Sequence, residues 1–345
     1  MMKIFKQCRT MFALCAKRFT MMEMIRRKGE VLGMRKRKMI MVAALTIFIC
    51  LSLTGCKSSD YKKGVECQTS GDYEGALELY KGIEDYENYK DTADRVNECE
   101  AMIAAIEKYN AAKESLEKKN IDLDSLISDS EALIAEKKIP LDDTLIPALE
   151  TKISETKAAK QSISEMPTTE TEILEVVKTM EAVDYGEITD NLNNSKTALE
   201  KSIKQYALVD NPAEAYIIEC LGKVEHVVDI SAVTEDNDPN GNLNKPGGYT
   251  ATVYYSDDRI SLDKSVYGNT VIEQGTDGGG GIEVYATVED AEKRRDYLSS
   301  FDGGILASGT HTVVGTVLVR TSNELTASQQ QEMEAKIIEV LTYVE

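Results

Sequence analysis

The stretch NPAEAYIIECLGKV, Asn211 to Val224, stands where the sequence changes from one pattern to another. Up to about Lys223 the chain is rich in Ala, Glu, Lys, Leu and Ile, whereas Gly, Thr, Val and Tyr dominate afterwards. Asn211 and Pro212 are a capping residue and a first-turn residue, a pair that predicts the start of a helix. We therefore expect a separate C-terminal domain at 209–345.

Downstream of this helix, apolar and polar residues alternate with the period of a half-buried strand. A helical segment, VEDAEKRRDYLSSF at 288–301, interrupts these runs, and another, LTASQQQEMEAKIIEVLTYV at 325–344, ends the chain. The last segment has Thr326 and Gln329 at the spacing of a capping box. This order predicts an α+β domain whose antiparallel sheet is covered on one face. The apolar strand positions are Val228, Ile230, Ala232, Tyr249, Ala251, Val253, Tyr255, Ile282, Val284, Ala286, Val313, Val317 and Val319.

Upstream, residues 98–208 have the apolar spacing of successive amphipathic helices. Pro140 and Pro167 punctuate this region, and a proline ends or kinks a helix. Because these breaks interrupt any long heptad register, we expect a short antiparallel bundle or an elbowed stalk rather than a long coiled coil. The fold class is therefore α+β overall, with an all-α region before the sheet domain.

The segment YKKGVECQTSGDYEGALELYKGI, 61–83, precedes this helical region. Gly64, Tyr73, Ala76 and Tyr80 lie at the spacing of a tetratricopeptide unit, which the segment resembles. The segment departs from that pattern at Cys67, where an aromatic residue is preferred. The resemblance implies a helical hairpin at 56–97 that packs on a neighbouring helix and offers an interaction surface.

Two cysteines lie in the expected hairpin and in the helix that follows it. Cys67 and Cys99 lie on successive expected helices, where they either pair as a disulfide or serve as small buried apolar residues. The chain has no CxxC pair, which disfavours a thiolate zinc site.

The front of the chain contains MRKRKMIMVAALTIFICLSLTGC, Met34 to Cys56. Four cations precede an apolar run that is too short for a comfortable membrane span and has the length of a signal-peptide core. Leu53, Thr54, Gly55 and Cys56 then resemble the lipobox of bacterial lipoproteins. The resemblance implies that 34–55 is a signal peptide, that cleavage falls between Gly55 and Cys56, and that Cys56 carries a lipid. The expected location is the extracytoplasmic face of the cell membrane.

Residues 1–33 precede the signal peptide. The codons for Lys28, Gly29 and Glu30 can spell a ribosome-binding site at the right distance from Met34, so we interpret 1–33 as a mis-assigned start. The alternative is a disordered cytoplasmic extension rich in Lys and Arg.

Charge is unevenly distributed. Residues 1–55 hold 12 of the 40 Lys and Arg and 2 of the 59 Asp and Glu, which leaves the exported part with a net charge near −29. Such a chain repels nucleic acid, so nucleic-acid binding is excluded. The membrane, through the lipid, and a protein or cell-envelope component are the expected partners.

Three long runs in the C-terminal domain, TEDNDPNGNLNKPGGYTATVYYS, GTDGGGGIEVYATVEDAEKRRDYLSSFDGG and SGTHTVVGTVLVRTSNELTASQQ, resemble a domain that recurs in lipoproteins and surface proteins of Gram-positive bacteria. The resemblance implies an extracellular location and no catalytic activity.

Asp236, Asp238 and Asn240 alternate before Gly241, as ligands do in the first half of a calcium loop. The second half of the calcium-loop pattern is not matched, because Gly247 occupies the position where a bidentate Glu is needed. The same residue types suit a wide hairpin turn. We therefore expect no cofactor, with a weak calcium site as the alternative.

GTDGGGG, 275–281, lacks the Lys-Ser or Lys-Thr of a phosphate loop and precedes a strand, so a flexible connector or bulge is expected. The two histidines, His226 and His311, show no catalytic motif, although Ser308 lies near His311. Arg294 or Arg295 is expected to form an ion pair with Glu283 or Asp302. The sequence thus favours a non-enzymatic surface module for binding or scaffolding. The alternatives are an envelope hydrolase and a calcium-dependent module.

Overall fold

The computed structural model describes residues 57–261, 266–304 and 308–345. The expected signal peptide, its cleavage site and Cys56 lie outside these residues. The chain divides into two compact units, the first ending at Ile106 and the second beginning at Glu107. None of the helices in the described ranges is long and apolar enough to span a membrane.

The first unit is a helical hairpin with a third helix against it. It consists of α2 (Lys57–Ser70), α3 (Tyr73–Lys81), the short η1 (Tyr86–Asn88) and the beginning of α4 (Thr92–Ala135). Gly64 lies under the ring of Tyr80, where a Cβ atom would stand 2.5 Å from Tyr80 Cε1. α4 supplies Val96 and Cys99 to this core, as expected for a hairpin that packs on the following helix.

α4 is longer than the sequence pattern indicated. The expected end of the hairpin at residue 97 falls inside it, because neither Gly nor Pro occurs between Thr92 and Lys137 and the helix continues. Pro140 and Pro167 both lie in non-helical segments, as predicted. The helices that follow in the second unit are α5 (Leu145–Ala159), α6 (Glu170–Glu181) and α7 (Gly186–Leu208), and α5 packs against α7.

The sheet domain confirms the predicted α+β class. Its five strands lie in the order β1-β2-β3-β5-β4, and every neighbouring pair is antiparallel. The strands are β1 (Val227–Ala232), β2 (Tyr249–Asp257), β3 (Gly279–Tyr285), β4 (His311–Val314) and β5 (Val317–Thr321). The helical elements are α8 (Glu214–Leu221), α9 (Val271–Gln274), η2 (Gly275–Gly278), α10 (Val288–Ser299) and α11 (Ala327–Leu341).

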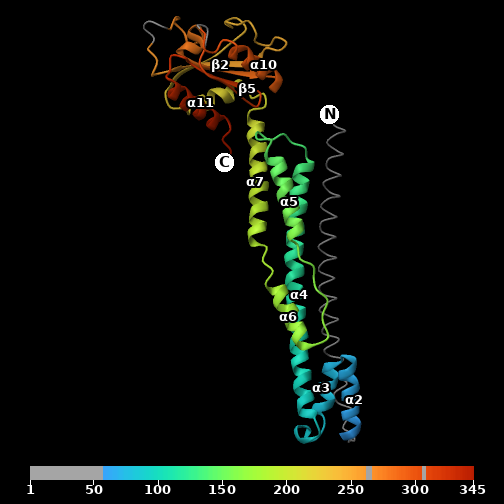
Figure 1. The fold of residues 1–345 in the computed structure, drawn as a ribbon. Coiled ribbons are helices and arrows are strands. Elements are labelled where there is room, and N and C mark those ends of the chain that lie inside the picture. Colours follow the sequence, from blue (N-terminus) through green and yellow to red (C-terminus); the bar gives the residue numbers. More distant parts are fainter. Residues whose placement is uncertain (1–56, 262–265, 305–307) are drawn as a thin grey trace, which may run out of the picture. The chain divides into compact units, whose positions relative to one another are not determined.

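Helices cover both faces of the sheet, and the expectation of one covered face is wrong. Val317 and Val319 of β5 pack with residues of α8 and α11. Leu318, which points the other way, packs with Ala291 and Leu298 of α10. Figure 1 shows α10 and α11 beside the labelled strands β2 and β5. The second apolar face escaped detection because its strand positions mix tyrosines with charged residues.

Two helix-start predictions had different outcomes. The capping box of Thr326 and Gln329 is present at α11, with Met333, Ile337 and Leu341 buried as expected. Asn211 does not cap α8, which begins at Glu214. Its backbone N–H instead donates to Thr316 Oγ1 at 2.6 Å, and its side-chain oxygen accepts from Thr250. Asn211 therefore fastens the start of the domain to the sheet.

Candidate functional site

A buried ionic cluster lies on the α10 side of the sheet. Glu283 of β3 is 1% exposed and contacts two arginines from different elements. Its Oε1 accepts from Arg320 Nη1 of β5 at 2.9 Å, and its Oε2 accepts from Arg294 Nε of α10 at 3.1 Å. The Tyr285 hydroxyl donates to Oε2 at 2.6 Å. The expected ion pair between Arg294 and Glu283 is confirmed, whereas Arg295 pairs with Asp296 and Glu292.

The ionisation of Glu283 follows from these contacts. Burial raises the cost of its charge, but Arg320 and Arg294, together with the Tyr285 hydrogen bond, hold its pKa below the ordinary value. The carboxylate is therefore charged at neutral pH and locks α10 to β3 and β5. Such a cluster fixes one packing of the helix on the sheet.

Arg320 is the member of the cluster that sequence reasoning missed. It is a lone cation in an apolar strand, which is the available signal, since a charge in such a strand needs a buried partner. Its Nη2 also donates to Ser308 Oγ at 3.2 Å, while its Nε has no hydrogen-bond partner within the described ranges.

The two histidines do not form a hydrolase site in the described part of the chain. Ser299 Oγ and Asp302 Oδ2 both contact His311 Nε2, at 2.8 and 3.3 Å. A serine–histidine relay needs the serine and the carboxylate on opposite ring nitrogens. His311 Nδ1 is buried and lacks a partner among the residues that the structure describes, and Ser308 contacts Arg320 instead.

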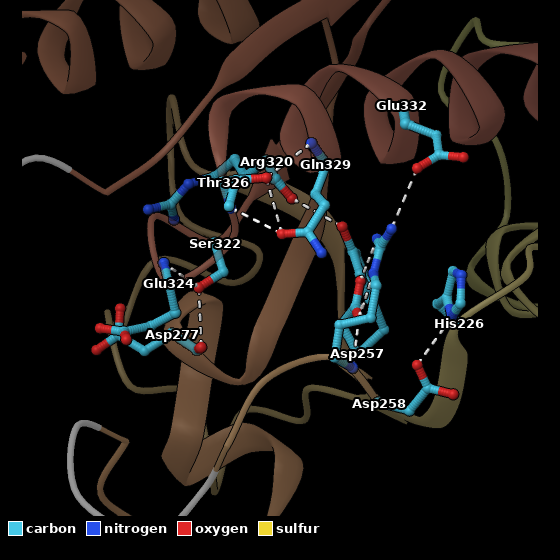
Figure 2. A network of polar contacts seen from close by, with 12 residues as sticks. His226, Asp257, Asp258, Asp277, Arg320, Ser322, Glu324, Thr326, Gln329 and Glu332 are labelled. Carbon is cyan, nitrogen blue, oxygen red and sulfur yellow. Dashed lines mark hydrogen bonds and ion pairs between the residues drawn. The ribbon is translucent and has the colours of Figure 1, made fainter.

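A second polar network lies at the end of the sheet where β2 meets α11 (Figure 2). Asp257 accepts two hydrogen bonds from the Arg259 side chain, from Nε at 2.9 Å and from Nη2 at 2.7 Å, and a third from the Arg259 backbone N. Arg259 Nη1 continues to Glu332 of α11 at 3.2 Å. Beside it, His226 Nδ1 lies 2.8 Å from Asp258 Oδ1, as Figure 2 shows. This network fastens β2 to α11 and contains no acid–base relay.

The calcium candidates lie in the loop between β1 and β2. Asp238 is half-buried, and both of its carboxylate oxygens accept hydrogen bonds from backbone N–H groups of the loop. Oδ1 accepts from Asn240 N and from the Tyr249 hydroxyl, and Oδ2 accepts from Asn242 N at 2.6 Å and Leu243 N at 2.8 Å. Partial burial opposes ionisation of Asp238, but these donors hold its pKa below the ordinary value.

The described residues contain no group of three or more His, Cys, Asp or Glu that would hold a metal ion. Asp236 and Asn240 are exposed. The geometry of Asp238 is that of a turn-forming aspartate whose oxygens replace backbone acceptors.

The Asp238→Ala substitution tests this structural role. We expect it to lower the free energy of unfolding by about 2 to 4 kcal/mol, because several donors to a charged acceptor lose their partner. Asp236→Ala, in the same loop, is the matched control and should change it by less than about 0.5 kcal/mol. Urea denaturation measures both variants. A calcium site would instead show a rise in the wild-type Tm on adding millimolar calcium, which both variants reduce.

The segment at 275–281 was expected to be a flexible connector or a bulge, and this prediction is wrong for its last three residues: Gly275–Gly278 form η2, and the strand β3 begins at Gly279 without a bulge. Gly279, Gly280 and Gly281 are the first residues of β3, are buried, and pair with β2. A Cβ atom on Gly279 would stand 2.4 Å from Tyr255 O, and one on Gly280 would stand 2.2 Å from the Tyr255 hydroxyl oxygen. Glycine is required here because neighbouring strands and the Tyr255 ring occupy the space of a side chain.

The three cysteines in the described residues, Cys67, Cys99 and Cys220, are free thiols, so the disulfide alternative is not realised. Burial raises the pKa of the Cys99 and Cys220 thiols, which favours their protonated form.

These observations define an α+β protein with a helical hairpin, a helical segment and a sheet domain locked by buried ion pairs. No family model, no curated protein and no solved structure matches this chain.

Proposed function

We propose that this chain is a lipid-anchored protein of the extracytoplasmic face of the cell membrane, where it binds a protein or envelope partner without catalysis. The observation that carries the proposal is the order of four cations, a short apolar run and the LTGC motif at 35–56 of the sequence. α2 begins at Lys57, one residue after the LTGC motif that ends at Cys56. Cleavage before Cys56 would make α2 the first described helix after the lipidated residue.

The anchor supplies the free energy that holds an acidic chain at a membrane. Each methylene group buried in the bilayer contributes about 0.8 kcal/mol, and two or more acyl chains make the attachment stable. The exported part carries a net charge near −29 and gains nothing from anionic headgroups. The lipid on Cys56 must therefore provide the attachment by itself.

The Cys56→Ser substitution tests this proposal in the producing cell. We expect wild-type protein in the membrane fraction and the variant in the soluble or secreted fraction, because serine accepts no thioether-linked lipid. Mass spectrometry of the wild-type amino terminus should find a diacylglyceryl group on Cys56. Cys67→Ser, which changes another thiol of the exported part, should leave the protein in the membrane. A Cys56→Ser protein that stays membrane-bound, or a wild-type cysteine without lipid, contradicts the proposal.

A further inference from the structure

An open groove lies in the helical part of the second unit, where α6 ends and α7 begins. It has a volume of about 560 Å³ and is lined by residues from the end of α5, from α6 and from the first two turns of α7. Its apolar wall includes Ala182, Val183 and Ile188, and its polar rim includes Asp184 and Glu187.

The floor of the groove is fixed by a ring of hydrogen bonds. Tyr185, which is 8% exposed, donates its hydroxyl proton to Asn120 Oδ1 at 2.9 Å and accepts from Gln161 N at 2.7 Å. Asn120 Nδ2 closes the ring on Gln161 O at 3.0 Å. Lys119 Nζ of α4 donates to Val183 O at 2.6 Å, which holds the turn between α6 and α7. The groove is therefore preformed rather than created by a ligand.

Acidic side chains outnumber basic ones around the groove, where Lys119 is already bound to Val183 O. Lys178 is the only basic residue between 165 and 190, and every acidic side chain of that stretch is exposed. Among the described residues, the ion pairs of the helical segment lie elsewhere and leave these carboxylates without a cation. The carboxylates belong to Glu165, Glu170, Glu172, Glu175, Glu181, Asp184, Glu187 and Asp190.

We propose that this groove binds an extended basic segment of a partner protein. The apolar stem of a Lys or Arg side chain fits against Val183 and Ile188 while its charged head reaches Asp184 and Glu187. A small polyamine would leave the apolar wall uncovered. A second copy of this chain is disfavoured because each exported copy carries a net charge near −29. The inference rests on the proposed binding function and names its partner class.

The test uses the full-length protein in detergent and two fluorescent peptides, one alternating lysine with leucine and one with glutamate in place of lysine. We expect saturable binding of the lysine peptide, measured by anisotropy and weakened by salt, and no binding of the glutamate peptide. The double variant Asp184→Asn/Glu187→Gln should weaken binding about tenfold, since it removes two charge contacts. The asparagine side chain introduced at position 184 would retain the oxygen that accepts from Gly186 N, which in the wild type is Asp184 Oδ1 at 2.8 Å.

Two further variants separate the groove from diffuse attraction. Asp143→Asn/Glu150→Gln removes the same two residue types from an exposed part of the helical segment and should change affinity by less than about twofold. Ala182→Trp fills the groove at an exposed position without changing charge and should weaken binding as much as the groove double variant. Equal weakening by the Asp143/Glu150 control, normal binding by Ala182→Trp, or absence of saturable binding overturns the inference. Since this assay does not depend on the lipid, its failure leaves the result of the Cys56→Ser experiment unaffected.

Discussion

Replacing Glu283 with Gln lowers the free energy of unfolding of the sheet domain by about 3 to 5 kcal/mol, the cost of removing one partner from a buried ion pair. The side chains of Glu283, Arg320 and Arg294 are 1%, 7% and 18% exposed. Without the carboxylate, two guanidinium groups stay in a poorly solvated place with only a neutral amide between them. Denaturant unfolding followed by near-ultraviolet tyrosine signals measures the loss.

Glu292→Gln is the matched control for this prediction. Glu292 lies on the same helix α10 but is exposed, and its Oε1 contacts only Arg295 at 3.6 Å. An exposed pair of this kind contributes between 0 and about 1 kcal/mol. If the two variants lose equal stability, the cluster does not stabilise the packing of α10 on the sheet.

The same cluster predicts a pH dependence with a definite sign. Although Glu283 is buried, Arg320 and Arg294 hold its folded-state pKa below the ordinary value of 4.5. The contribution of Glu283 to the free energy of unfolding is therefore fully present above pH 4.5. It is lost as the pH falls through the lowered pKa of the folded state. The difference in stability between wild type and Glu283→Gln should narrow at acidic pH. A difference that stays constant down to the acid-unfolding range contradicts this account.

The main architecture was predictable because it follows from periodicity. Alternation at Ala251, Val253 and Tyr255 predicts β2, although a register shift places Tyr249 on the other face of the sheet. The heptad-breaking prolines predict the interruptions after α4 and α5. The capping box at Thr326 places the start of α11 for the same local reason. Each of these signals acts within a few residues and needs no knowledge of tertiary contacts.

The site was less predictable because its residues come together only through sheet pairing. Arg320 reaches Glu283 from the neighbouring strand, a contact set by the pairing of Glu283 with Leu318. Asp238 suggested calcium because turn formation and metal binding both use clustered oxygens and glycine. The groove beside Tyr185 was missed because it depends on a hydrogen bond to Asn120, 65 residues away.

Gly280→Ala is the other substitution with a large expected effect. It should lower the free energy of unfolding by at least about 3 kcal/mol. A methyl group there would meet the Tyr255 hydroxyl oxygen at 2.2 Å and Arg320 O at 2.4 Å. Tyr255 is fully buried, and its hydroxyl donates to that same carbonyl at 3.3 Å, so the ring has no free space to enter. The substitution must therefore separate β3 from its neighbours or break this hydrogen bond. Thermal unfolding, followed by circular dichroism, measures the effect.

Gly222→Ala shows whether steric contact, rather than loss of glycine as such, causes the effect. Gly222 ends α8 with φ −63° and ψ −10°, and a Cβ atom there would come no closer than 3.5 Å to Ile218 O. Alanine is compatible with that conformation, so stability should change by less than about 1 kcal/mol or rise slightly. The double variant Gly280→Ala/Tyr255→Val should lose less stability than the sum of the losses in the two single variants, because removing the Tyr255 ring also removes the clash with the new methyl group. Additive losses would show that β3 tolerates the methyl group and that Gly280 is not held by Tyr255.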